Sequence, residues 1–174
     1  MSVITTHKKT VGVKTEFAKE VEGWKSLKLV DSFFVKYQKI SPNEALSNAL
    51  ELKDLVKKLK DTIKPIIFEV PSFNTRVNIL YNETLRLADL IDIKAIKATE
   101  VNEQVAKTID AFSSVKLKIN TMLLKKKYED ELYITSEYIG LDSTRIDSVS
   151  KNSIDLLQNE KLKGKLENKK DAVQ

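Results

Sequence analysis

The sequence predicts an all-α protein, folded as an antiparallel up-and-down bundle of four main helices. Three observations support this fold class. The 174 residues include only 4 glycines and 3 prolines, so long stretches of the chain lack helix breakers. Apolar residues recur at three- or four-residue steps, which is the spacing of one face of a helix. Hydrophobic residues make up 41% of the chain and charged residues 32%, as expected for a globular domain with a buried core.

The pattern divides the chain into three parts. Residues 1–15 are polar and β-branched without helical spacing, and we expect a flexible N-terminal arm there. Residues 16–141 carry the periodic apolar pattern and are expected to form the helical bundle domain. Residues 142–174 are rich in lysine, asparagine and glutamate, and we expect a weakly structured or helical tail. Apolar residues between positions 146 and 157 allow a short fifth helix.

The first helix is expected over residues 16–38, with an aromatic-rich apolar face. Such a stripe is more often core than a ligand-binding surface, and we interpret it as core. The residues of this face are Phe17, Val21, Trp24, Leu27, Val30, Phe34 and Tyr37.

The second helix begins at the strongest local signal in the chain. The Ser41 side chain can accept a hydrogen bond from a backbone N–H of the first turn, and the Glu44 carboxylate can reach back to the N–H of Ser41. Pro42 fits the first helical position, where its missing N–H costs no hydrogen bond. We expect one long helix from this capping box to about residue 63, with Val56 and Ile63 in its buried face, and Ile66 falls close to the same apolar line.

Pro65 interrupts the second helix. We expect a kinked continuation of one turn and then a loop that ends at Pro71, with a strand over residues 66–70 as the alternative. The third helix should follow over residues 72–91. Its expected buried face consists of Phe73, Val77, Leu80, Thr84, Leu87 and Ile91.

A polar ladder lies opposite that apolar face. Asn74, Asn78 and Asn82 follow one another at four-residue steps, and Arg86 ends the series. Side-chain amides in a row can offer donors and acceptors to a partner, whereas the simpler interpretation is a solvated helix face. Glu83 and Arg86 are also placed for a weak local ion pair.

The fourth helix is expected to begin at Thr99 as N-cap and to end near three consecutive lysines. These lysines, Lys125, Lys126 and Lys127, would suit the negative end of the helix dipole. The alternative is that they bind a membrane surface or nucleic acid. The narrow buried face is expected to contain Val101, Val105, Ile109, Phe112, Val115, Ile119 and Leu123.

Beyond the lysines the pattern is weaker. Tyr133, Ile134, Tyr138, Ile139 and Leu141 either cover one end of the bundle or form an exposed docking patch. Gly140 is the expected stop of this segment.

The inventory of reactive side chains argues against an enzyme. The chain has no cysteine and a single histidine, His7, which lies in the arm where it has no partner ligands for a metal. The Glu-x-x-His pairs of a di-metal bundle are missing, and no glycine-rich phosphate loop is present. A serine nucleophile would lack its usual base, and we therefore expect no cofactor and no metal.

The charge pattern indicates a solvated surface. The formal net charge is +5, and 27 of the 30 basic residues are lysines interleaved with 25 acidic residues. Arginine, which phosphate recognition usually favours, is scarce, so nucleic-acid binding is not expected. Peripheral contact with an anionic membrane stays open, since such contact depends mainly on charge.

Several runs resemble uncharacterised helical lipoproteins of the bacterial envelope over about residues 20–130. The resemblance includes no catalytic motif. The chain has neither a leader nor a lipidation cysteine, so the expected location is the periplasm or cell envelope if a leader was removed, and otherwise the cytoplasm. The runs are Trp24, Phe33–Phe34 and Tyr37, then Ile40–Leu46, Leu55–Asp61, Arg76–Leu80 and Glu83–Leu87.

Taken together, these observations favour a non-enzymatic interaction or structural protein that presents helical surface to a protein partner. The alternative is a lysine-rich bundle that binds an anionic surface electrostatically. Salt distinguishes the two hypotheses, because electrostatic binding to such a surface weakens steeply with ionic strength.

Overall fold

The computed structural model describes residues 2–138 and 156 of the chain. Within these residues the protein is mostly helical, which agrees with the all-α class. The chain divides into two compact units, Met1–Lys127 and Tyr128–Gln174, and the contacts described below lie within the first. The α-helices are α1 (Lys25–Lys36), α2 (Pro42–Ser47), α3 (Ala49–Asp61), α4 (Pro71–Asp89) and α5 (Ala98–Tyr138). Single 3-10 turns span Thr15–Phe17, Lys19–Val21, Ile66–Phe68 and Leu90–Asp92, and the strands are β1 (Thr5–Thr6) and β2 (Lys39–Ile40).

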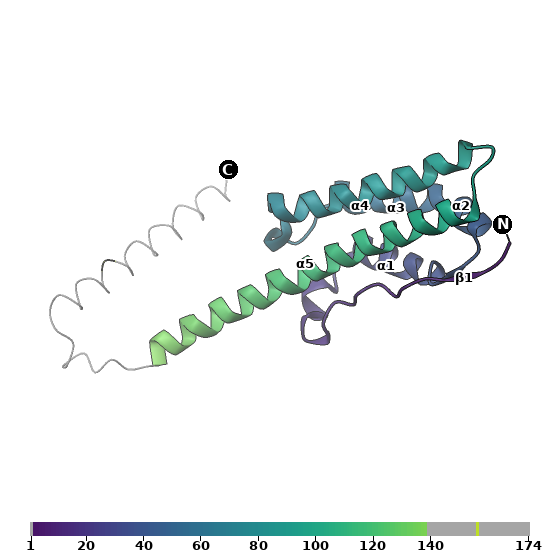
Figure 1. Cartoon of the computed structure of the whole chain (residues 1–174). Helices are drawn as coiled ribbons and strands as arrows, with labels where there is room; N and C mark the ends of the chain where they lie inside the picture. Colours follow the sequence, from purple (N-terminus) through teal and green to yellow (C-terminus); the bar gives the residue numbers. More distant parts are fainter. Residues whose placement is uncertain (1, 139–155, 157–174) are drawn as a thin grey trace, which may run out of the picture. The chain divides into compact units, whose positions relative to one another are not determined.

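The helices pack around one apolar core. α3 packs against both α1 and α4. α5 runs in the direction opposite to α4 (Figure 1) and reaches α1 through Phe34 and Phe112, whose rings stack with centroids 4.5 Å apart. The four positions that test the predicted faces are Val56, Val77, Ile109 and Phe112, and each is at most 2% exposed. The predicted faces of α4 and α5 are therefore confirmed, except that Ile91 is 43% exposed.

The predicted first helix is interrupted at its start. Two 3-10 turns cover its first part, and α1 begins only at Lys25, because the backbone of Trp24 leaves the helical region (φ −85°, ψ 79°). The Trp24 ring instead stacks on Phe68 at 5.3 Å and lies 5.8 Å from Phe73. All seven residues of the predicted apolar face are nevertheless buried. Aromatic packing between distant segments thus overrides helical continuity here.

The capping box is confirmed, but the helix after it is not continuous. Glu44 N–H donates to Ser41 Oγ at 3.3 Å, and Ser41 N–H donates to the Glu44 carboxylate at 3.0 Å. Asn48, with φ −91° and ψ −5°, separates α2 from α3. Asparagine competes with helix formation through local hydrogen bonding, which suits it to such a break.

The predicted continuation beyond Pro65 is wrong. α3 ends at Asp61, Thr62 is extended, and the chain crosses to α4 through a loop with a 3-10 turn, which also takes the place of the alternative strand. Phe68 anchors this turn in the core with no exposed surface. Ile63 and Ile66, placed near the buried line by helical spacing, are 93% and 86% exposed.

The N-terminal arm differs from the expected flexible segment. β1 pairs antiparallel with β2, with Thr5 opposite Ile40. Farther along, residues 10–14 follow α5 through hydrogen bonds to its side chains (Figure 1). The α5 side chains involved are Ser113, Lys116 and Asn120, and Asn102 Nδ2 donates to Thr5 Oγ1 in β1. The arm satisfies its backbone groups on the helix surface and is anchored there.

The boundaries of α5 also differ from the prediction. The helix begins at Ala98, and the Glu100 carboxylate accepts a hydrogen bond from Lys97 N–H at 2.8 Å, so Thr99 is not the N-cap. The helix continues to Tyr138 rather than ending near Lys127. The side chains of Tyr133, Ile134 and Tyr138, together with Ile139, Gly140 and Leu141, lie outside what the structure describes, as does the predicted tail apart from Leu156.

Candidate interaction surface

The predicted asparagine ladder winds around α4 instead of forming one flat face. A four-residue step advances a helix by about 40° beyond a full turn, so a long ladder drifts. Asn74 is half-buried on the α3 side, where its Oδ1 accepts a hydrogen bond from Lys64 Nζ at 2.7 Å. Asn78 and Asn82 are exposed, and Asn78 also borders the end of α3. Arg86 is exposed next to Glu83, toward α5.

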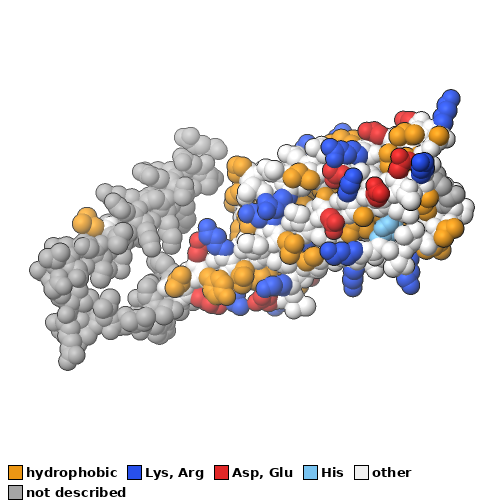
Figure 2. Space-filling view, viewed as in Figure 1, with side chains coloured by type: hydrophobic (Ala, Val, Ile, Leu, Met, Phe, Trp, Pro, Cys, Tyr) orange, Lys and Arg blue, Asp and Glu red, His pale blue; other side chains and the backbone are white. Residues whose placement is uncertain are grey.

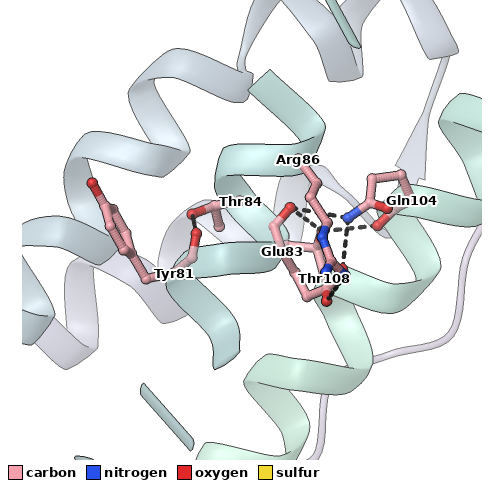
Figure 3. Close-up of polar contacts among 6 residues, drawn as sticks. All are labelled: Tyr81, Glu83, Thr84, Arg86, Gln104 and Thr108. Atoms are coloured by element: carbon pink, nitrogen blue, oxygen red, sulfur yellow. Dashed lines mark hydrogen bonds and ion pairs between the residues drawn. The ribbon is translucent and has the colours of Figure 1, made fainter. Parts of the chain in front are cut away.

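The ion pair predicted between Glu83 and Arg86 is confirmed, with a separation of 2.7 Å. Figure 3 shows that the same carboxylate also faces α5. Gln104 Nε2 donates to Glu83 Oε2 at 2.8 Å and to the Glu83 carbonyl oxygen at 3.0 Å. Thr108 Oγ1 donates to the Gln104 carbonyl at 2.8 Å. This cluster joins α4 to α5, and the sequence pattern did not reveal it because Gln104 and Thr108 lie beside the apolar face.

The three lysines of α5 lie inside the helix, so the proposed interaction with a helix C-terminus does not apply. All three side chains are exposed. Lys127 Nζ lies 3.0 Å from the Glu16 carboxylate, and Lys126 Nζ lies 3.8 Å from that of Glu20. These acids belong to the 3-10 turns before α1, so the lysines bind the turns to α5.

A shallow depression lies between the end of α3 and the first turns of α4. It has a volume of about 250 Å³ and contains two of the predicted site residues, Asn74 and Asn78. The remaining lining consists of Lys60, Asp61, Lys64 and Val77. All of the lining residues except Val77 are polar or charged, and they include two ammonium groups and two amides able to donate hydrogen bonds to an anion.

Polar groups on the arm side of α5 form a second cluster that the sequence pattern missed. The Lys116 side chain is only 3% exposed and forms an ion pair with Asp31 of α1. Its Nζ donates to Thr10 Oγ1 at 2.9 Å and lies 4.6 Å from the centroid of the Phe112 ring. Asn120 accepts a hydrogen bond from Lys14 N–H and donates one to the Gly12 carbonyl. This cluster fastens the arm.

Three pKa shifts have local structural causes. Burial, with a smaller contribution from Glu51, raises the pKa of Tyr37, whose hydroxyl donates to the Ala45 carbonyl. Hydrogen bonds from Ser41 lower the pKa of Glu44. Burial lowers the pKa of His7, and the neighbouring Asn102 amide partly offsets this effect. Nε2 of His7 and Oδ1 of Asn102 are both buried without a hydrogen-bond partner.

The part of the chain that the structure describes contains no group of three or more side chains placed to hold a metal ion. Nor does any described helix combine the length and apolar character that crossing a membrane requires. In comparisons with known proteins, no protein-family model, no curated protein and no solved structure matched this chain.

Proposed function

We propose that this is a non-enzymatic interaction protein, in which α1, α3, α4 and α5 form an antiparallel four-helix bundle that presents the outer face of α4 to a protein partner. The observation that carries the proposal is this face itself. Asn78 and Asn82 are exposed there, and Ile79 between them is 48% exposed. We call these three residues the α4 outer face.

The helix that carries this face is held on both sides. Lys64 donates to Asn74 near its beginning, and Gln104 bonds to Glu83 near its end. A rigid helix loses little conformational freedom when it binds, so a surface of this kind is suited to specific recognition. Amides flanking a half-exposed isoleucine match the mixed polar and apolar character of protein interfaces.

The alternative proposal, binding of an anionic surface through the lysine triplet, has less support. Lys126 and Lys127 already lie close to Glu20 and Glu16, so part of their charge is compensated within the protein. A protein partner on the α4 outer face should also bind with weak salt dependence, because amide and apolar contacts contribute most of that interface.

Site-specific photo-crosslinking in the source cells tests the proposal. We expect a crosslinker at position 82 to yield one adduct of defined mass, and Asn78→Arg to reduce its yield strongly. The matched control is position 54, where the Asp54 side chain is 67% exposed on α3. The same adducts at both positions, or an adduct unaffected by Asn78→Arg, would contradict the assignment of this face.

A further inference from the structure

The loop between α3 and α4 exposes two large apolar side chains to solvent. Ile63 is 93% exposed and Ile66 is 86% exposed, the two highest values among the large hydrophobic residues that the structure describes. Single exposed hydrophobic residues are common on protein surfaces. Two of them on one short loop, each almost fully exposed, indicate a loop that contacts an apolar phase.

The base of this loop is held in place while its isoleucines point outward. Thr62 Oγ1 bonds to Ser26 Oγ at 3.0 Å and to the Lys58 carbonyl at 2.7 Å. Phe68 stacks on Trp24 and lies 5.3 Å from Phe73. An ordered base lowers the cost of ordering the chain when the exposed isoleucines bind. Figure 2 shows hydrophobic side chains at the end of the bundle where α4 begins.

The segment that carries the isoleucines is rich in lysine. Residues 57–69 contain four lysines and two acids. Lys60 and Lys64 line the depression beside the loop, together with Asn74 and Asn78. Lys64 Nζ uses one hydrogen bond on Asn74, which leaves the other N–H groups of this ammonium for a ligand. The one acid in the depression is Asp61.

We propose that this loop docks the protein onto the surface of a membrane that contains anionic phospholipids. Ile63 and Ile66 enter the boundary between headgroups and acyl chains, and the nearby lysines contact lipid phosphates. The depression lined by Lys60, Lys64 and Asn74 takes the phosphate of one headgroup. Apolar insertion combined with basic charge is how interfacial protein segments bind membranes.

The combination of positive charge and apolar side chains on the loop favours an anionic membrane over a neutral apolar partner or a nucleic acid. A neutral apolar partner would not need Lys60 and Lys64 beside the loop, and a nucleic acid would not use two exposed isoleucines. The two proposals share Asn78, which belongs to the α4 outer face and also lines the depression. The isoleucine variants below leave Asn78, Ile79 and Asn82 unchanged, so they test the loop separately from the α4 outer face.

Vesicle flotation tests the proposal with the full chain. Vesicles of phosphatidylcholine are compared with vesicles of phosphatidylcholine and phosphatidylserine. We expect the protein to float only with the anionic vesicles. Ile63→Ser/Ile66→Ser should lower the partition coefficient by roughly tenfold or more, since two apolar side chains no longer enter the lipid. The matched control is Leu29→Ser/Val35→Ser on α1, whose side chains are 56% and 62% exposed, and it should bind like the wild type.

A second pair of variants tests the charges. Lys60→Gln/Lys64→Gln should also weaken binding, by about tenfold at low salt, whereas Lys94→Gln/Lys107→Gln should not. Thermal melts verify that each variant is folded. Equal binding to neutral and anionic vesicles, no binding of the wild type to either, or unchanged binding of the isoleucine variant would overturn the proposal. Binding to DNA as strong as that to vesicles, and insensitive to the isoleucines, would do the same.

Discussion

The ammonium group of Lys116 forms an ion pair with Asp31, and this contact joins α5 to α1 beneath the N-terminal arm. The Lys116 side chain is 3% exposed, whereas that of Asp31 is 53% exposed. A buried ammonium without partners would be costly, so the hydrogen bond to Thr10 and the contact with the Phe112 ring matter as well. One side chain thus links two helices and the arm.

The first prediction concerns this pair. Asp31→Asn should lower the free energy of unfolding by about 1–3 kcal/mol, below the usual cost for a fully buried pair because solvent screens Asp31. Urea denaturation measures the loss. Asp54→Asn is the control, since Asp54 lies 4.0 Å from Lys53 and is mostly exposed, and its effect should stay within about 0.5 kcal/mol. Equal losses in the two variants would show that the buried pair has no special role.

The second prediction concerns the anchor of the arm. Asn120→Ala removes the acceptor for Lys14 N–H and the donor for the Gly12 carbonyl, so it should cost about 1–3 kcal/mol. Hydrogen exchange should accelerate at Lys14. Thr121→Ala is the matched control, because the Thr121 hydroxyl bonds only within α5, to the Leu117 carbonyl. Unchanged exchange at Lys14 in the Asn120 variant would argue against the anchor.

The third prediction is a pH dependence of the arm. Folding lowers the pKa of His7 from its ordinary value of 6.5, so the unfolded chain binds the proton more readily than the folded one. The stability from neutral His7 is complete above pH 6.5 and decreases as the pH falls toward the lower folded pKa. The protection factor of the backbone amide of residue 7, which donates to the Gln38 carbonyl, should therefore fall in mild acid after correction for the slower intrinsic exchange at low pH. His7→Gln should remove most of this fall, and an identical pH profile of protection in that variant would exclude His7 as the cause.

The fourth prediction tests the core. Phe112→Ala should reduce the free energy of unfolding by about 3–5 kcal/mol, because it removes a fully buried ring that stacks on Phe34. Chemical denaturation gives the value. Leu117→Ala, at a position 52% exposed, should cost about 1 kcal/mol or less. A small loss at Phe112 would show that the buried face of α5 is assigned incorrectly.

The fifth prediction tests the capping box. Ser41→Ala should destabilise the protein by about 1 kcal/mol, since Glu44 N–H loses its acceptor. Ser47→Ala, which removes an exposed hydroxyl bonded to the Asn43 carbonyl, should be close to neutral. Thermal or urea unfolding compares the two. A larger effect at Ser47 than at Ser41 would contradict the role of the cap.

Features with local causes could be predicted from the amino-acid sequence alone. The cap at Ser41 depends on residues three positions apart, as does the ion pair between Glu83 and Arg86. Residues close together in the sequence are therefore enough to predict both. The buried faces of α4 and α5 follow from helical periodicity, because an amphipathic helix packs its apolar face against the core of the protein. Asn78 and Asn82, which the pattern set opposite the apolar face, are exposed.

Features that depend on contacts between distant segments could not be predicted in this way. Trp24 breaks the expected first helix because Phe68 and Phe73 offer it a stacking site. Asn120 lies at the edge of an apolar face, and only the arm, more than 100 residues away in sequence, explains it. Ile63 is the opposite case. Its helical spacing predicted burial, but α3 ends at Asp61, and Ile63 is therefore exposed to solvent. Burial depends on which segments meet, and periodicity within one helix does not contain that information.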